Sequence, residues 1–322
     1  QMTWNGYYHR DTQKMNSKVC NCLLTWLVVS LAFIGVAVWT ASIPPVIHAA
    51  FSASPQVGPT TGLEATVAVT STSPLTTTAP ALSGDLNVLA AASLTESFTD
   101  LGRQFETDNP EVDITFNFAG SQQLAQQINL GAPADVFASA DARQMSVVIE
   151  SGNVVSGTQQ ILVRNRLAVV YPADNPGQIT TLRDLAKPGL RLVLAAKEVP
   201  VGQYALEFLD KASSDPAFGP EFEANVLKNV ASYEQNVKAV LSKVVLGEAD
   251  AGIVYVTDAA TDKSGATVQL DIPDHLNSIA IYLIATLKDS PQPELAKAFV
   301  DFALSPLGQD ILASYGFVRG YQ

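Results

Sequence analysis

The sequence LNVLAAAS, residues 86–93, combines a strand signal with a helix signal. Leu86 to Ala92 is a short apolar run, which predicts a strand buried on both faces. Ser93 and Glu96 have the spacing of a capping box, and an amphipathic pattern continues to Phe105. A strand that turns directly into a helix leaves free backbone N–H groups at the positive end of the helix dipole. Such a turn can hold an anion.

The same arrangement recurs further along the chain. Residues 112–118 alternate as a strand and lead into Ser121, where a second amphipathic pattern begins. Ala134–Ala138 is a short buried strand followed by a helix pattern over 141–150. This βαβαβα order predicts a doubly wound α/β sheet, in which ligands lie at the carboxyl ends of the strands. Ser93 and Ser121 both lie at such strand ends, so we expect them to contact a ligand and not only to cap their helices.

A second α/β series lies between two long strand-like runs, residues 160–171 and 278–287. We therefore predict an α/β fold with two lobes, each a mostly parallel sheet flanked by helices, joined by two crossover strands. The first lobe is expected to hold residues 85–163 and 283–322, and the second residues 164–282. The cleft between the lobes is the expected binding site, and hinge closure is the expected motion.

The N-terminal region has the composition of a leader and a tether. Within residues 1–49, Leu23–Ile43 is an uncharged apolar run that suits either a secretory signal, cleaved after Ala49, or a retained membrane anchor. Residues 50–84 are rich in Ser, Thr and Pro and are expected to form a linker. We therefore expect an exported, extracytoplasmic protein of the periplasm or cell surface.

Composition limits the possible partners. The chain has 322 residues, is 47% apolar and carries a formal net charge of −12. This length and apolar content support two lobes with ordinary cores. The negative charge argues against nucleic acid and against an anionic membrane surface as partners.

The sequence offers little for catalysis. Beyond the leader region the chain has a single histidine, His275, in the polar segment PDHLN. A Gly-x-Ser-x-Gly elbow, a Walker loop and a Gly-x-Gly-x-x-Gly motif are all absent from the sequence. Asp135 and Asp141 are expected to act as caps. We interpret the chain as a non-enzymatic protein without a cofactor.

Several motifs, in matching order, resemble one family. VLAAASLTESF (88–98), FAGSQQLAQQINLGAPADVFASAD (118–141), EVPVGQYALEFL (198–209), EADAGIVYVTDA (248–259) and the closing YGF resemble the periplasmic molybdate-binding proteins of ABC importers, which are type II solute-binding proteins. The resemblance implies capture of molybdate or tungstate and its delivery to an ABC permease. It implies no cofactor and no direct ligand to a metal ion.

The resemblance also implies a set of neutral donors around the oxyanion. Ser93 and Ser121 would each supply a hydroxyl and a backbone N–H group, Val201 and Val237 would supply backbone N–H groups, and Tyr255 would supply its phenol. The first four of these residues lie at or near predicted helix starts. A site with donors only suits a fully deprotonated dianion and disfavours hydrogen phosphate, whose proton would find no acceptor.

One departure and two alternatives accompany this hypothesis. Gln122 and Gln123 stand where the family often has Ser-Gly, so the wall beside Ser121 is expected to be bulkier or to offer another donor. A sulfate or thiosulfate binder of the same fold, or a membrane-tethered sensor lobe, would show similar motifs. We expect the protein to act as a monomer.

Overall fold

The computed structural model of the chain describes residues 81–155 and 157–320, which belong to one compact unit. The predicted signal or anchor of residues 1–49, with its apolar segment 23–43, lies outside the described residues, as does most of the predicted linker over 50–84. In the described ranges, none of the helices has the length and apolar character needed to span a membrane.

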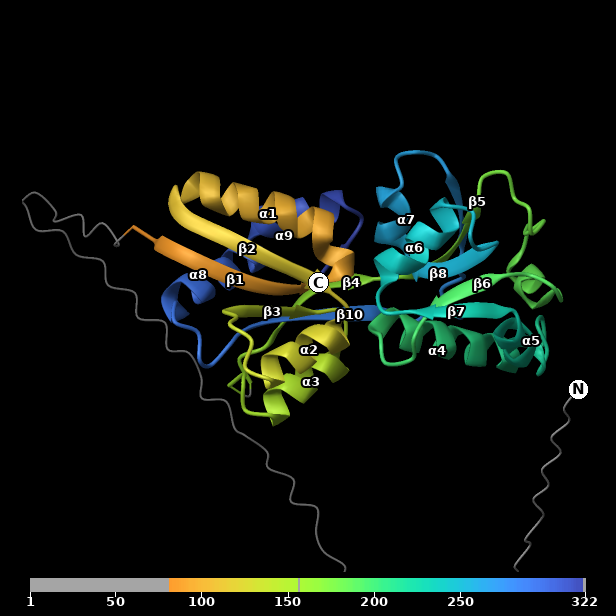
Figure 1. Cartoon of the computed structure of the whole chain (residues 1–322), viewed down its shortest axis with the longest axis horizontal. Helices are drawn as coiled ribbons and strands as arrows, with labels where there is room; N and C mark the ends of the chain where they lie inside the picture. Colours follow the sequence, from red (N-terminus) through yellow and green to blue (C-terminus); the bar gives the residue numbers. More distant parts are fainter. Residues whose placement is uncertain (1–80, 156, 321–322) are drawn as a thin grey trace, which may run out of the picture. The chain divides into compact units, whose positions relative to one another are not determined.

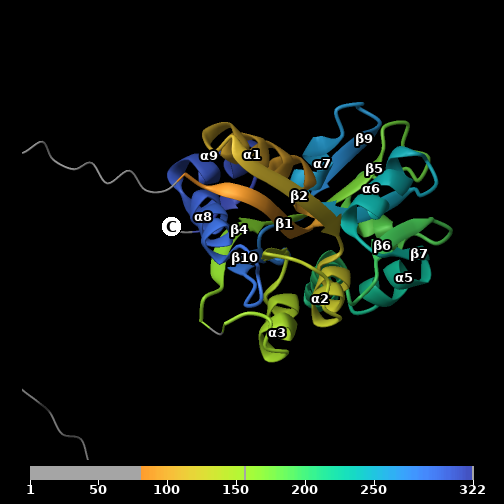
Figure 2. The ribbon, with the colours of Figure 1, turned by 60° about the vertical axis from the view of Figure 1, so that its left-hand side comes forward.

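The first lobe is built on a six-stranded sheet with the order β11-β4-β10-β3-β1-β2 (Figure 1). Helices α1, α8 and α9 cover one face of this sheet, and α2 and α3 cover the other (Figures 1 and 2). The elements are β1 (Ser83–Ala91), the 3-10 turn η1 (Ala92–Leu94), α1 (Thr95–Asp108), β2 (Glu111–Ala119), α2 (Ser121–Asn129), β3 (Val136–Ser139), α3 (Ala142–Glu150), β4 (Gln160–Asn165), β10 (Ala280–Thr286), α8 (Pro293–Leu304), α9 (Pro306–Ser314) and β11 (Val318–Arg319).

The second lobe is built on a five-stranded sheet with the order β7-β6-β8-β5-β9. Helices α6 and α7 lie on one side of it, and α4 and α5 lie on the other (Figure 1). The elements are β5 (Leu167–Pro172), the 3-10 helix η2 (Leu182–Ala186), β6 (Leu192–Ala195), α4 (Pro200–Ser214), α5 (Phe222–Lys228), β7 (Val230–Glu234), α6 (Val237–Val245), β8 (Ala251–Tyr255), α7 (Val256–Thr261) and β9 (Thr267–Asp271).

The predicted two-lobed α/β fold is confirmed, with both sheets mixed. β1 pairs in parallel with β2 and β3, and β6 pairs in parallel with β7 and β8. β10 runs antiparallel to β3 and β4, and β5 runs antiparallel to β8 and β9. The antiparallel pairs arise because β5 and β10 carry the chain from one lobe into the other. The expectation of mostly parallel sheets therefore holds for the strands that precede helices and fails at the crossovers.

The crossovers are short. The run 160–171, expected as one strand, divides into β4 and β5, which belong to different sheets and are separated only by Arg166. The chain returns to the first sheet between β9 and β10. By strand membership the first sheet extends to Asn165 and resumes at Ala280. The lobe limits given from the sequence stay a prediction.

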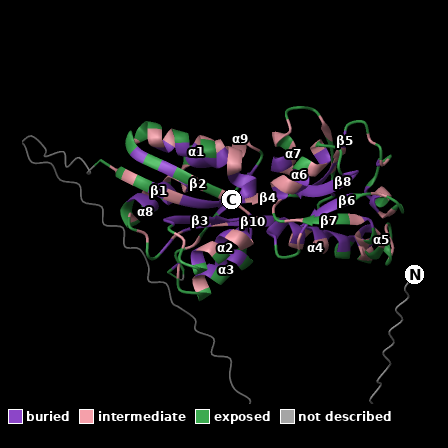
Figure 3. Cartoon of the chain, in the orientation of Figure 1, coloured by how far each residue is buried: buried purple, intermediate pink, exposed green. Residues whose placement is uncertain are grey.

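From Leu86 onward, strand β1 is buried on both faces apart from the half-buried Asn87, as its apolar run predicts (Figure 3). Leu86 and Val88 pack in one cluster with the aromatic rings of α1 and α8, and the Phe98 and Phe299 centroids lie 6.2 Å apart. Leu89 packs on the opposite face with apolar side chains of α2 and α3. Burial of each such side chain stabilises the fold by roughly 1.5–3 kcal/mol. This packing fixes the end of β1, where Ser93 lies.

Candidate functional site

A small pocket lies between the two lobes, where turns that lead into helices meet from both sides. About 210 Å³ of space free of atoms lies in the pocket and in the open solvent that adjoins it. All five residues proposed from the sequence line it. The full lining is Ala91, Ala92, Ser93, Ala119, Gly120, Ser121, Ala140, Val199, Pro200, Val201, Asn236, Val237 and Tyr255. The structure thus brings these five positions together, while their role in binding stays a proposal.

The first lobe contributes Ser93 and Ser121. Ser93 lies in the η1 turn directly after β1, and Ser121 is the first residue of α2, directly after β2. Both side chains are buried. Because β1 and β2 are parallel neighbours, their carboxyl ends lie side by side at one edge of the sheet. The first N–H groups of a helix have no partner within the helix and are free to bind an anion.

The second lobe contributes two helix starts. Val201 lies in the first turn of α4, after Pro200, and Val237 is the first residue of α6. Their side chains are buried in the apolar core. An isopropyl group cannot hydrogen-bond, so the backbone N–H is the only donor that either residue offers to the pocket.

Tyr255 is the last residue of β8, and its ring is 1% exposed. Within the described part of the chain its hydroxyl has no hydrogen-bond partner. A buried hydroxyl without a hydrogen-bond partner costs free energy, so such groups in native proteins usually bind a ligand or a water molecule. Burial raises the pKa of the Tyr255 phenol well above its ordinary value of 10.0. The phenol therefore keeps its proton and can donate it to an anion.

The capping box predicted at Ser93 is wrong. The N-cap of α1 is Leu94, with no side-chain cap bond, because the η1 turn shifts the start of the helix. The Ser93 hydroxyl instead lies 2.8 Å from the hydroxyl of Tyr282. Glu96, the other member of the predicted box, pairs with Lys238 of the opposite lobe. Both side chains thus make contacts across the molecule rather than along their own helix.

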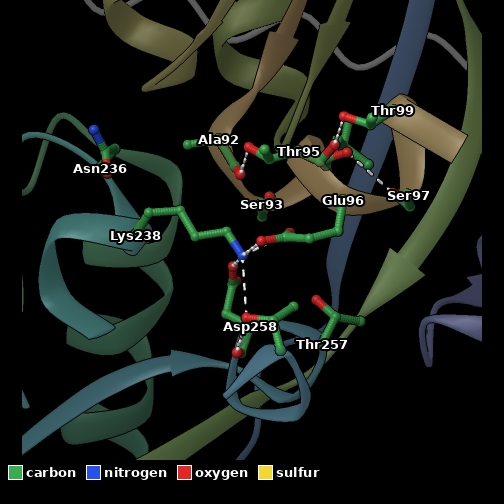
Figure 4. A network of polar contacts seen from close by, with 12 residues as sticks. Ala92, Ser93, Thr95, Glu96, Ser97, Thr99, Asn236, Lys238, Thr257 and Asp258 are labelled. Atoms are coloured by element: carbon green, nitrogen blue, oxygen red, sulfur yellow. Dashed lines mark hydrogen bonds and ion pairs between the residues drawn. The ribbon is translucent and has the colours of Figure 1, made fainter. Parts of the chain in front are cut away.

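A charged network lies beside the pocket (Figure 4). The Nζ of Lys238 lies 2.7 Å from the carboxylate of Glu96 and 3.1 Å from that of Asp258. Burial raises the pKa of Asp258 to about 6, although the neighbouring Lys238 acts in the opposite direction. The only sequence signal for this network is that Lys238 directly follows Val237. Sequence reasoning missed it.

The pocket itself is uncharged: its lining, drawn entirely from described residues, contains no Asp, Glu, Lys or Arg. Any anion held there is bound by dipoles and hydroxyl groups. The low polarity of a buried site strengthens each of these contacts.

The lobes touch at the mouth of the pocket. The Gln122 amide donates to the carbonyl of Gln235 at 2.8 Å, and the Gln123 amide donates to the Gln235 side chain, also at 2.8 Å. On another side, Gln144 donates to the carbonyl of Glu198 at 3.2 Å. Gln122 thus connects the two lobes and is not among the lining residues. The structure describes a closed arrangement.

Residues 86–318 match the family described as bacterial extracellular solute-binding protein. The chain belongs to this solute-binding protein family. The molybdate-binding protein ModA of Mycobacterium bovis is 38% identical over 232 residues, which are 72% of this chain and 84% of that protein. ModA of Escherichia coli is 32% identical over 240 residues, which are 73% and 89%. The periplasmic molybdate-binding protein of Azotobacter vinelandii shares the fold, with a TM-score of 0.62 at 20% identity over 72% of this chain and 98% of that one.

Other residues singled out from the sequence of this solute-binding protein lie outside the pocket. Asp141 caps α3, as predicted, by accepting from the N–H of Gln144 at 2.8 Å. Asp135 accepts from the N–H of Asn87 at 2.7 Å and so connects the start of β3 to β1 instead of capping a helix. His275 is exposed, 3.3 Å from Asp215. No group of three or more His, Cys, Asp or Glu residues that could hold a metal ion occurs in the described ranges.

Proposed function

We propose that this protein captures molybdate, and tungstate as well, in the pocket between its lobes and delivers the oxyanion to an ABC permease. One observation carries the proposal: three hydroxyl-bearing residues and two helix starts converge on a small, uncharged pocket between the lobes. The proposed ligands are Ser93, Ser121, Val201, Val237 and Tyr255. The printed names of the relatives, molybdate-binding proteins, support the choice of anion.

The strength of such a site follows from its donors. A hydrogen bond to a charged group contributes roughly 1.5–3 kcal/mol net. About half a dozen of them would outweigh the cost of closing the lobes and ordering the ligand, and give micromolar or tighter binding. Backbone N–H groups cannot accept a hydrogen bond from the ligand, so a site that relies on them favours a fully deprotonated dianion.

We further propose that the protein is exported and acts as a monomer. The support is the apolar segment 23–43, followed by the Ser/Thr/Pro-rich residues 50–84. This order suits a signal or anchor, then a tether, then the binding unit. Sequencing the N-terminus of the exported protein distinguishes a cleaved signal from a retained anchor, and size-exclusion chromatography with light scattering tests the monomer.

Calorimetric titration of the purified protein with molybdate, tungstate and sulfate tests the binding function. We expect one oxyanion per chain, with clear heat for molybdate and tungstate. Absence of heat with molybdate beside clear heat with sulfate would contradict the proposal and favour a sulfate binder. Absence of heat with all three anions would favour a sensor lobe that has lost transport.

A further inference from the structure

A chain of buried polar groups leads from Ser93 across both crossovers. The Ser93 hydroxyl lies 2.8 Å from that of Tyr282, on β10. The Tyr282 oxygen in turn lies 3.5 Å from the side-chain nitrogen of Asn165, the last residue of β4. The same nitrogen lies 2.8 Å from the hydroxyl of Thr257, in α7. Tyr282 is 0% exposed, and Asn165 and Thr257 are each 2% exposed.

The direction of this chain is set at Asn165. Its side-chain oxygen accepts from the N–H of Arg166 at 2.9 Å, which fixes the orientation of the amide. Its nitrogen, which only donates, therefore faces Tyr282 and Thr257. The Tyr282 oxygen accepts from Asn165, which leaves the Tyr282 proton free to be donated to Ser93. Burial raises the pKa of the Tyr282 phenol well above 10.0, so this proton is retained.

With Tyr282 as the donor of this pair, Ser93 receives a hydrogen bond from inside the protein. Its oxygen accepts from Tyr282, so its own O–H is left to point into the pocket that Ser93 lines. Ser121 shows the same arrangement, because its hydroxyl oxygen accepts from the backbone N–H of Ala140 at 3.0 Å. In both serines an internal donor occupies the oxygen, and the proton remains for the ligand.

We propose that Asn165 and Tyr282 are positioning residues that orient the Ser93 hydroxyl as a donor toward the bound oxyanion. The proposal rests on the function proposed above. A serine hydroxyl that can rotate is able to donate or to accept, and so can also bind a protonated anion. A hydroxyl whose proton is held toward the ligand disfavours contact with an anion oxygen that carries its own proton, because two protons would then face each other. We call the hydrogen bonds from Asn165 through Tyr282 to Ser93 the relay. The relay therefore contributes both affinity and selectivity for deprotonated anions.

A double-mutant cycle on molybdate affinity tests the relay. Tyr282→Phe removes only the phenol oxygen, so the ring still packs edge-on to Tyr255 and Phe317. We expect Ser93→Ala to weaken binding by about 10-fold to 100-fold, and Tyr282→Phe by about tenfold, the effect of one hydrogen bond. In the Ser93→Ala background, Tyr282→Phe should change affinity by no more than about twofold, because the hydroxyl that it orients is gone.

Asn165→Asp tests the same relay in the reverse direction. A carboxylate only accepts hydrogen bonds, so the Tyr282 hydroxyl would donate to it. The Tyr282 oxygen would then accept a hydrogen bond from the Ser93 hydroxyl. The Ser93 proton is thereby withdrawn from the ligand. We expect a loss of affinity larger than that of Tyr282→Phe, and a smaller loss when the change is made in the Ser93→Ala background. The Ser93→Ala background retains the repulsion between the new charge and the anion. The difference between the two losses of affinity caused by Asn165→Asp therefore isolates the effect of reversing the hydrogen bonds.

The outcomes separate the relay from the function on which it rests. If the unmodified protein does not bind molybdate, the proposed function and the relay both fail. If it binds and Ser93→Ala leaves the affinity unchanged, Ser93 is not a ligand and the relay fails with it. If Ser93→Ala weakens binding and Tyr282→Phe has the same effect in both backgrounds, Tyr282 acts only on the fold. That result overturns the relay and leaves the binding function intact.

Discussion

The ammonium group of Lys238 in the second lobe lies 2.7 Å from the carboxylate of Glu96 in the first lobe (Figure 4). Lys238 directly follows Val237, and Glu96 lies three residues after Ser93. The ion pair therefore connects two of the turns that line the pocket. Because it crosses from one lobe to the other, it stabilises the closed arrangement more than the open one.

Glu96→Gln is expected to weaken molybdate binding a few-fold, mainly through faster dissociation. The pair is partly exposed, with 23% and 38% of the two side chains accessible, so its contribution is about 0.5–1 kcal/mol. Lys238 keeps its contact with Asp258, so little stability should be lost. Stopped-flow dissociation measures the effect. Lys297→Gln breaks an exposed pair with Asp301 within one helix and is the control. Equal dissociation rates for Glu96→Gln and the control would show that the pair does not hold the lobes together.

Gly120→Ala is expected to prevent closure without unfolding the first lobe. The backbone of Gly120 has φ −60° and ψ 136°, which alanine readily adopts. An added Cβ would collide with the carbonyl oxygen of Gln235, which belongs to the other lobe, and with the amide of Gln122, a flexible side chain of the same lobe that can move aside. We expect at least a tenfold loss of affinity, with a change in melting temperature of only a few degrees.

Gly202→Ala is the matched comparison. Its Cβ would collide with the carbonyl oxygens of Ala195 and Ala196, within the same lobe. This variant should lose both stability and binding, because the start of α4 must move away from β6. Similar melting curves for the two variants would contradict the interpretation that Gly120 serves closure rather than folding.

Tyr255→Phe is expected to separate binding from stability. The hydroxyl has no partner within the described residues, so its removal should leave stability unchanged or slightly increased. Affinity should fall by roughly 1–3 kcal/mol, because a donor to a charged ligand is lost. Thermal unfolding without ligand and calorimetry with molybdate measure the two effects. A clear loss of stability with unchanged affinity would identify Tyr255 as a packing residue.

Asp258 is expected to make stability depend on pH. Burial raises its pKa from 3.8 to about 6, so the folded state holds the proton more tightly than the unfolded state. Ionisation therefore destabilises the fold progressively from pH about 4 to about 6, and the effect is constant above that range. Asp258→Asn removes it. The stability of the variant relative to the unmodified protein should rise across this window, by roughly 1–3 kcal/mol. A difference in stability between the two proteins that does not change with pH across this window would contradict the prediction.

The parts of the fold that have strong local signals could be predicted from the sequence. The buried strands β1, β3, β6 and β8 are apolar runs, and the helices α1, α3 and α4, which follow the first three of them, are amphipathic. β7 and β9 were missed because they are short edge strands with half-exposed patterns and no apolar run. Pairing of β7 with β6 extends to Glu234, so α6 begins only at Val237.

The pocket could be predicted because helix starts recur and the motifs resemble one family. The groups that support it could not. Tyr282 meets Ser93 across 189 positions of sequence, and Lys238 meets Glu96 across 142. No local pattern encodes such contacts, since the first depends on the order of the strands in one sheet and the second on how the lobes meet. The capping-box spacing at Ser93 also gave a wrong prediction, because one 3-10 turn between strand and helix redirects both side chains.

Anomalous diffraction at the molybdenum edge, from crystals grown with molybdate, tests most directly whether uncharged groups of both lobes hold the oxyanion. We predict one strong peak per chain inside the pocket, with the hydroxyls of Ser93, Ser121 and Tyr255 and the N–H groups of Val201 and Val237 at hydrogen-bond distance from the oxygens around it. A peak beside lysine or arginine side chains, or one held by a single lobe, would contradict the account.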